Sequence, residues 1–203
     1  MASASRPNAA LALVFGLLAP GAGLWYAGRA RTGGAVLVLF LASLVVIPLL
    51  GTSGVVDLAL LPSMLRASAV ALWAPSAVFG VVAVVTSKDA ARPPWVHPWW
   101  VLGIVVASWA LSFALRTRVV SEHIVTFAVI DHRRLEPEAK EGALVVFKRS
   151  YAPNELRPGA LVLVSRDGKD QVARIVTTES GLVLDDGGKV SPADVIGVGG
   201  LAR

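Results

Sequence analysis

Only a few residues of this chain could do hydrolytic chemistry together. The sequence has no cysteine, which excludes disulfides, zinc–thiolate sites and cysteine nucleophiles. A serine becomes nucleophilic when a neighbouring base accepts its proton, and a neutral lysine can be that base. The polar half of the chain offers such pairs on paper: Ser121, Ser150 and Ser165 with Lys148 or Lys169. Because serines and lysines near turns are usually solvated, surface positions are the simpler interpretation.

Metal chemistry is not expected either. His123 and His132, with Glu122 and Asp131, lack the tight ligand spacing of a metal-binding element. The run Asp185-Asp186-Gly187-Gly188 predicts a hairpin turn rather than a calcium loop, because Asp-Gly favours hairpin turns. We therefore expect no metal and no cofactor.

The elements that would position these residues change character near residue 117. Residues 9–115 are apolar runs with almost no charge, whereas the sequence from Arg116 onward is polar and alternating. Residues 1–117 hold seven Lys or Arg against two Asp, so the net charge of +5 belongs to this half. Since these basic residues sit singly beside apolar runs, they are typical of membrane topology signals rather than of a nucleic-acid site. The sequence predicts a transmembrane domain over 1–117 and an extracytoplasmic β domain over 118–203.

Four apolar stretches approach the about 20 residues that a helix needs to cross a bilayer. They predict spans at 9–28, 33–51, 67–87 and 98–115. If the turn at Arg29 and Arg31 and the loop from Lys88 to Arg92 face the cytosol, the positive-inside rule places both termini outside. The prediction is a multi-pass protein of the inner (cytoplasmic) membrane, with the lipid bilayer as one partner.

No Asp, Glu, Lys or Arg lies within these predicted spans. Proton relays and ion paths normally need ionisable groups inside the bilayer, so a transporter or channel is disfavoured. Pro20, Pro48 and Pro75 could kink their helices, and we interpret all three as packing geometry.

The first hairpin carries a distinctive phrase, PGAGLWYAGRARTGG, over residues 20–34. Its glycines allow close helix approach, and its arginines can anchor a turn at lipid headgroups. The phrase resembles the Pro-Gly-x-Gly-x-x-Tyr-x-Gly-Arg hairpin of small bacterial two-span membrane modules. The matching positions are Pro20, Gly21, Gly23, Tyr26, Gly28 and Arg29. A structural role is expected for them rather than a specific ligand site.

After Arg118 the apolar residues recur every second position, separated by Pro, Gly and Asn, which predicts about six short strands. The first strand is expected to begin by Ser121. The fold class is therefore a membrane α-helical bundle of about four spans followed by a C-terminal all-β domain.

This β half resembles type I signal peptidases, membrane serine proteases that remove leader sequences. The stretch RLEPEAKEGALVVFKRSYAP (134–153) runs in register with the family's nucleophile block, and RPGALVLVS (157–165), ARIVT (173–177) and VSPADVIGVG (190–199) resemble its later blocks in order. The resemblance implies a signal-peptidase-like fold over about 121–200. It also implies candidate residues for a substrate groove: Leu135, Pro137, Val145, Tyr151 and Arg174.

The chemistry of that family is not implied. The nucleophile position is Arg134 and the position of the lysine base is Ala173. A guanidinium stays protonated and cannot attack a carbonyl, and a methyl group cannot accept a proton. Losing a nucleophile and its base together removes about 10⁶ in rate in triad proteases, so no catalytic residue is assigned and proteolysis is not expected.

The sequence therefore leads to a non-catalytic hypothesis. The β domain would bind an exported or membrane polypeptide at the outer face of the inner membrane, for instance by pairing an extended segment with a strand edge. Two alternatives stay open: an active leader peptidase with an unrecognised Ser–Lys dyad, and a structural membrane assembly subunit that works through its glycine-rich hairpin.

Overall fold

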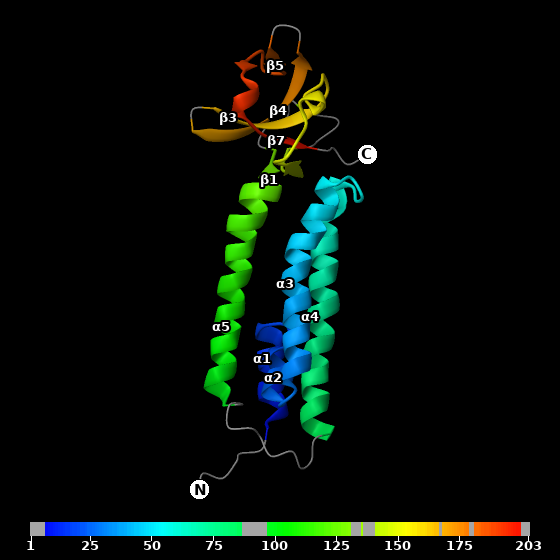
Figure 1. Cartoon of the computed structure of the whole chain (residues 1–203), viewed down its shortest axis with the longest axis vertical. Coiled ribbons are helices and arrows are strands. Elements are labelled where there is room, and N and C mark those ends of the chain that lie inside the picture. The colour runs from blue at the N-terminus through cyan, green and yellow to red at the C-terminus, as the bar shows by residue number, and fades with distance from the viewer. Residues whose placement is uncertain are drawn as a thin grey trace. The chain divides into compact units, whose positions relative to one another are not determined.

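The computed structural model describes residues 7–86, 97–130, 135, 141–166, 168–178 and 181–199. It divides into two compact units. The first comprises Met1–Val45 and Met64–Leu115, and the second comprises Val46–Ser63 and Arg116–Arg203. The first unit is helical, and the second contains all the described strands together with helical residues from 46–63 and 116–124 (Figure 1).

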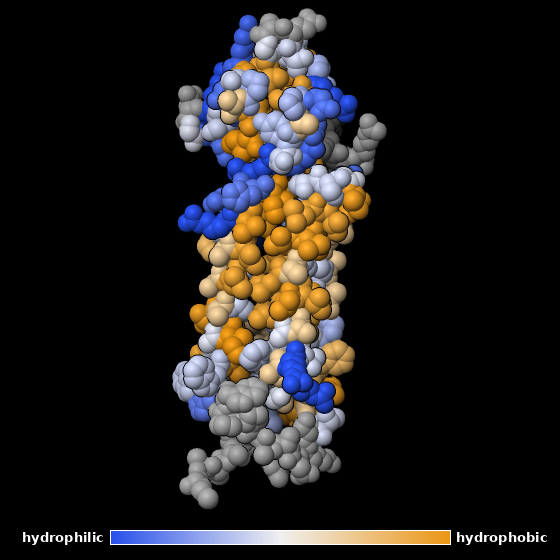
Figure 2. All heavy atoms as spheres, in the orientation of Figure 1, coloured by the Kyte–Doolittle hydropathy of each residue, from blue (hydrophilic) through white to orange (hydrophobic). Residues whose placement is uncertain are grey.

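Three helices in the described residues are long and apolar enough to cross a membrane. They are built on α3 (Ala30–Thr52), on α4 (Leu61–Thr86), which follows the short 3-10 helix η1 (Leu58–Leu60), and on α5 (Pro98–Ala114), which continues as the π-helix η2 (Leu115–Ile124). The face of these helices seen in Figure 2 is mostly hydrophobic. They match the predicted spans 33–51, 67–87 and 98–115. Pro48 and Pro75 lie inside α3 and α4.

The first predicted span, 9–28, is not one continuous helix. It forms α1 (Ala9–Leu18) and α2 (Ala22–Tyr26), separated by a break at residues 19–21. Pro20 lies in this break, and Gly21 has φ of +83°, a left-handed conformation that glycine adopts at little cost. At 10 residues α1 is too short to cross the about 30 Å hydrocarbon layer, since a helix rises 1.5 Å per residue.

The core of the first unit is centred on α1 and α2. Ala12, Phe15, Ala22 and Tyr26 pack with Val101 and Val105 of α5 in one buried cluster. The rings of Phe15 and Tyr26 have centroids 5.3 Å apart. The outer faces of the long helices carry exposed apolar residues such as Leu39, Phe79 and Phe113.

The second unit contains a seven-stranded antiparallel sheet in the order β1-β2-β7-β3-β4-β5-β6. The strands are β1 (Val125–Val129), β2 (Leu144–Lys148), β3 (Leu161–Arg166), β4 (Lys169–Thr177), β5 (Leu182–Leu184), β6 (Lys189–Val190) and β7 (Val195–Gly199). Two 3-10 helices, η4 (Pro153–Glu155) and η5 (Pro192–Asp194), lie in the connections. The predicted all-β character of this half is confirmed.

The alternating pattern of the strands produces two buried clusters. One contains Leu135, Val145, Phe147, Leu161 and Leu163 among its members. The other is formed chiefly by Val162, Val164, Ala173, Ile175 and Val195. Neighbouring residues of β3 thus contribute to different clusters, as the period of two along a strand requires.

The start of the β domain differs from the prediction. A strand was expected by Ser121, but the helical segment continues as η2 to Ile124, and β1 begins at Val125. Arg118 and Glu122 form an exposed ion pair across one turn of this segment, with Nη1 and Oε1 3.7 Å apart. The polar sequence after Arg116 had suggested an earlier end to the helix, because composition does not distinguish a polar helical end from a loop.

Candidate functional site

Ala173, which the resemblance to signal peptidases aligns with their lysine base, is a core residue in this structure. Ala173 lies on β4 opposite Val162 of β3, and only 6% of its surface is exposed. Its methyl group packs among Val164, Leu182 and Val195. Arg134, at the family nucleophile position, and Pro137 lie outside the described residues. The described surroundings of Ala173 are apolar, and residue 173 itself has no side-chain proton acceptor.

The residues predicted to line a substrate groove are distributed over separate places. Leu135 and Val145 are together, but both are buried in the first core cluster. Tyr151 packs against the second cluster, and its hydroxyl donates a hydrogen bond to the carbonyl oxygen of Val195 at 2.8 Å. Burial raises the pKa of Tyr151. Arg174 is half-buried on β4, and its backbone N–H donates to Asp185 Oδ1 at 3.2 Å.

The lysine of the alternative dyad has another partner. Lys148 forms an ion pair with Glu155. Desolvation raises the pKa of Glu155, but the hydrogen bond from the Ala152 backbone and the bond and charge of Lys148 lower it, and the net pKa lies below its usual value. Among the described residues no hydrogen bond joins a serine hydroxyl to a lysine amine; Ser150, Ser165 and Lys169 are exposed.

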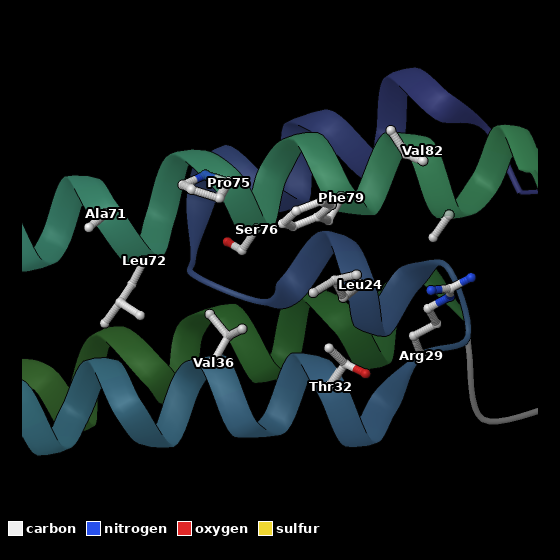
Figure 3. Close-up of a pocket in the computed structure, with 11 residues that line it drawn as sticks. Leu24, Arg29, Thr32, Val36, Ala71, Leu72, Pro75, Ser76, Phe79 and Val82 are labelled. Carbon is white, nitrogen blue, oxygen red and sulfur yellow. The ribbon is translucent and has the colours of Figure 1, made fainter.

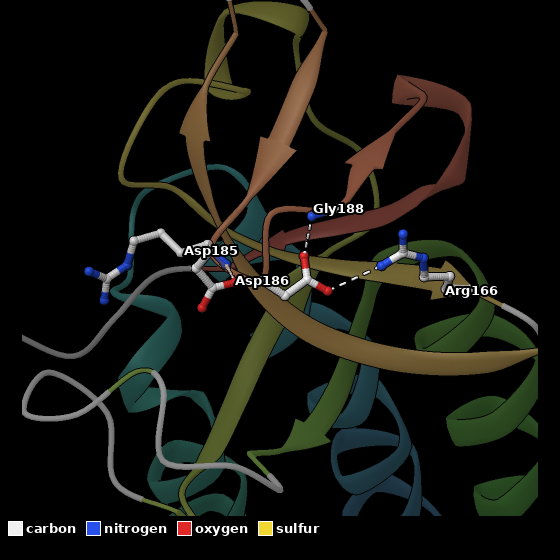
Figure 4. A network of polar contacts seen from close by, with 5 residues as sticks. Arg166, Asp185, Asp186 and Gly188 are labelled. Carbon is white, nitrogen blue, oxygen red and sulfur yellow. Dashed lines mark hydrogen bonds and ion pairs between the residues drawn. The ribbon is translucent and has the colours of Figure 1, made fainter.

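The predicted turn at residues 185–188 is confirmed as the connection between β5 and β6. Asp186 organises it, because one carboxylate oxygen accepts the Gly188 N–H at 2.7 Å and the other accepts from Arg166 at 3.1 Å (Figure 4). Within the described ranges no three His, Cys, Asp or Glu side chains are grouped as metal ligands. His132 and Asp131, which were weighed as part of a metal set, lie outside those ranges.

The glycine-rich hairpin is the most specific arrangement in the first unit. Here α2 folds back on α1, so that the Asn8 backbone N–H donates to the Tyr26 hydroxyl at 3.3 Å. A Cβ atom on Gly23 would collide with the carbonyl oxygen of Ala12, and one on Gly16 would lie 2.7 Å from the Cα of Ala77. Small residues at these positions allow α1, α2 and α4 to approach backbone to backbone.

The break between α1 and α2 exposes backbone groups, and side chains from other helices satisfy them. The indole Nε1 of Trp73 donates to the Gly16 carbonyl at 2.9 Å, and that of Trp109 donates to the Leu18 carbonyl at 2.7 Å. The Gly21 N–H donates to Ser76 Oγ at 3.2 Å. Inside a bilayer, unpaired backbone groups are costly, and broken helices need such partners.

Sequence reasoning missed these three partners. Trp73, Ser76 and Trp109 lie within apolar runs, where they were counted only as span residues. Their signal was available in principle, because an indole N–H or a hydroxyl in an apolar segment needs an acceptor or donor. What the sequence could not provide was the pairing of each donor with a carbonyl more than 50 positions away.

Beside the hairpin lies a cavity of about 370 Å³ between α2, α3 and α4. Arg29 and Thr32 line one end of it, as the sticks in Figure 3 show, and Ala71 and Leu72 line the other. Phe79 and further apolar side chains of α4 form its long wall. The cavity thus has a cationic, polar end and an apolar body.

Comparison with known proteins adds no relative: no protein-family model, curated protein or solved structure matches this chain.

Proposed function

We propose that this chain is a multi-pass protein of the bacterial inner membrane whose β domain works outside the cytoplasm as a non-catalytic, signal-peptidase-like interaction module. The membrane location is supported by the three long apolar helices. The likeness to signal peptidases rests on the four sequence blocks between residues 134 and 199. The proposal that the β domain is non-catalytic is supported by Ala173, which is buried in the second core cluster.

The fold of the hairpin supports a proposed orientation. Since α2 returns along α1, the segment before α1 and the turn at Arg29 belong to the same side of the membrane. If the three candidate spans each cross the membrane, residues 29–31 and the sequence between α4 and α5 lie on one side and the β domain lies on the other. Arg6, Arg29, Arg31, Lys88 and Arg92 share the first side, which the positive-inside rule assigns to the cytosol. The proposed orientation is therefore N-in and C-out, whereas four spans would give N-out and C-out.

A free strand edge is the observation that carries the interaction proposal. β1 is the first strand in the sheet order, and within the described residues only β2 pairs with it. The Ile130 N–H bonds to the Ala143 carbonyl, and the Arg149 N–H bonds to the Ile124 carbonyl. By the alternation of an antiparallel ladder, the N–H and C=O groups of Phe127 and Val129 point away from β2.

An extended polypeptide can pair with such an edge by main-chain hydrogen bonds, which require neither a serine nor a lysine. Val129, the last residue of this edge, is 57% exposed. The partner that fits is an exported or membrane polypeptide that passes the outer face of the membrane in an extended form.

The test uses the full chain in nanodiscs and a synthetic leader peptide of an exported precursor. Val129→Pro removes one outward N–H without removing a β1–β2 bond, and we expect it to weaken peptide binding about fivefold, the value of about one hydrogen bond. The matched variant Val129→Ala keeps the N–H and should bind within about twofold of the parent protein.

Equal binding by the proline variant and the parent protein would overturn the edge-pairing proposal. The same mixture also reports proteolysis. Cleavage of the leader peptide that is abolished by replacing a single serine would favour the alternative of an active peptidase, and an intact peptide supports the non-catalytic proposal.

A further inference from the structure

We propose that the cavity between α2, α3 and α4 binds one anionic phospholipid, with the phosphate at Arg29 and Thr32 and an acyl chain along α4. The inference depends on the proposed membrane location but not on the proposed role of the β domain. It concerns the first unit alone, because every residue that lines the cavity belongs to that unit.

The size of the cavity suits one acyl chain and its headgroup linkage. Its volume of about 370 Å³ lies within the about 300–1,000 Å³ of small-molecule sites. Its wall on α4 runs from Ala71 to Ala83, which is about 18 Å at 1.5 Å per residue. That length is close to half of the about 30 Å hydrocarbon layer, so the cavity extends through one leaflet.

The lining of the cavity changes from polar at the Arg29 end to apolar along α4. Arg29 directly precedes α3 and Thr32 is in its first turn, whereas Val36, Leu72 and Phe79 line the body. Ser76 also lines the cavity, but its hydroxyl is already used, since it accepts from Gly21 and donates to the Trp73 carbonyl. The polar groups available to a ligand are therefore at the Arg29 end (Figure 3).

The charge at that end selects an anion. The guanidinium of Arg29 is exposed and has no ion-pair partner among the described residues. A guanidinium can hold a phosphate by two parallel N–H···O bonds. In the proposed orientation Arg29 faces the cytoplasmic leaflet, where anionic lipids attract basic residues. A ligand with a phosphate at one end and a hydrocarbon chain at the other satisfies both parts of the cavity.

The test measures which lipids stay bound when the full chain is released from nanodiscs of equimolar phosphatidylglycerol and phosphatidylcholine into a mass spectrometer. The parent protein should retain one phosphatidylglycerol. Arg29→Gln should lower the preference for phosphatidylglycerol about tenfold, because it loses a charge-assisted hydrogen bond. The matched variant Arg31→Gln removes a charge two residues away that does not line the cavity, and it should keep the preference within about twofold.

Occupancy of the apolar body is tested by filling it. Ala71→Phe places a ring at the apolar end of the cavity and should release the retained lipid, whereas Ala74→Phe, outside the lining, should not. Equal effects of the two arginine variants, or a lipid retained by folded Ala71→Phe protein, would overturn the proposal. Incorporation into nanodiscs and leader-peptide binding are scored separately, so failure of this site is distinguishable from failure of the proposed function.

A last arm separates a lipid from a free anion. Detergent-solubilised, delipidated full-length protein is heated with phosphatidylglycerol or with inorganic phosphate. We expect only the lipid to raise the melting temperature, by mass action on the folded state. An equal rise with inorganic phosphate would contradict the assignment, because it would mean that the hydrocarbon chain contributes nothing.

Discussion

Trp73 and Trp109 lie in apolar segments, but each has an indole N–H that acts as a hydrogen-bond donor. Each donates its indole N–H to a carbonyl near the end of α1, and the Trp73 ring also packs edge-on against Phe40 of α3. In water such a bond would compete with solvent, but in hydrocarbon the carbonyl has no other donor. The two indoles therefore make a broken helix compatible with a membrane interior.

Replacing Trp109 by Phe should destabilise the protein, because the Leu18 carbonyl loses its donor while most of the ring is kept. Interhelical hydrogen bonds in membranes contribute about 0.6 kcal/mol on average and up to about 1.7, so a loss in this range is expected. The free energy of unfolding in bicelles measures it. Trp100→Phe removes the same atom from an exposed indole and should cost under about 0.5 kcal/mol; equal losses would mean that the bond to Leu18 is not needed.

The burial of Ala173 is a property that its sequence position did not show. The resemblance to signal peptidases aligns Ala173 with a lysine base, but it could not show that Ala173 lies in a buried cluster with Val164, Leu182 and Val195. A lysine introduced there would lose solvation in an apolar cluster. Ala173→Lys would therefore be a substitution in the core.

Among the helices, the α1–α2 pair departs most from the pattern of a membrane span. Residues 9–28 have the composition of a span, yet Pro20 and the left-handed Gly21 reverse the chain after α1. Gly21 also lies against the first turn of α3, where its Cβ would collide with the Gly33 carbonyl. The turn is therefore specified by backbone conformation and by close packing together.

A comparison of Gly21 with Gly28 separates the effect of backbone conformation from the effect of close packing. Gly21 and Gly28 both have φ of +83°, so alanine at either position costs about 1–2 kcal/mol of left-handed strain. Only Gly21 also has a neighbour in the way, since nothing lies within 4 Å of a Cβ on Gly28. We expect Gly21→Ala to lower the free energy of unfolding by about 1–3 kcal/mol more than Gly28→Ala. Equal effects in bicelles would show that the close approach to α3 is not maintained in the membrane.

The sheet shows which features of an element follow from local pattern. The period of two predicted strands after residue 118, and seven are present. The Asp185–Gly188 turn was predicted because its residues favour that conformation locally. The place of β7 between β2 and β3 was not predicted, because pairing between distant strands is decided by packing rather than by nearby residues.

For the protein as a whole, the proposed N-in, C-out orientation can be tested cleanly because the chain has no cysteine of its own. Single cysteines at Pro7, Ser53, His97 and Ser150 supply one thiol each. We expect a membrane-impermeant maleimide to label Ser53→Cys and Ser150→Cys in intact spheroplasts, and to label Pro7→Cys and His97→Cys only after permeabilisation.

The informative position is Pro7. If Pro7→Cys is labelled in intact spheroplasts while His97→Cys is not, residues 9–28 cross the membrane and the four-span topology holds. If all four positions give the reverse pattern, the orientation is inverted and the β domain lies in the cytosol. Labelling after permeabilisation is the control that each thiol is reactive.

The sequence by itself determined the division into an apolar helical half and an alternating β half, the three long apolar helices among the four spans it predicted, and the presence of alanine at residue 173. These properties depend on composition, on the period of apolar residues and on the identity of one residue, all of which are local. Only the tertiary structure decided that α2 returns along α1, that Trp73, Ser76 and Trp109 satisfy the break, and that Arg29 ends an apolar cavity. These depend on contacts between residues far apart in the chain, where backbone hydrogen bonding and close packing select one arrangement from many that share the same pattern.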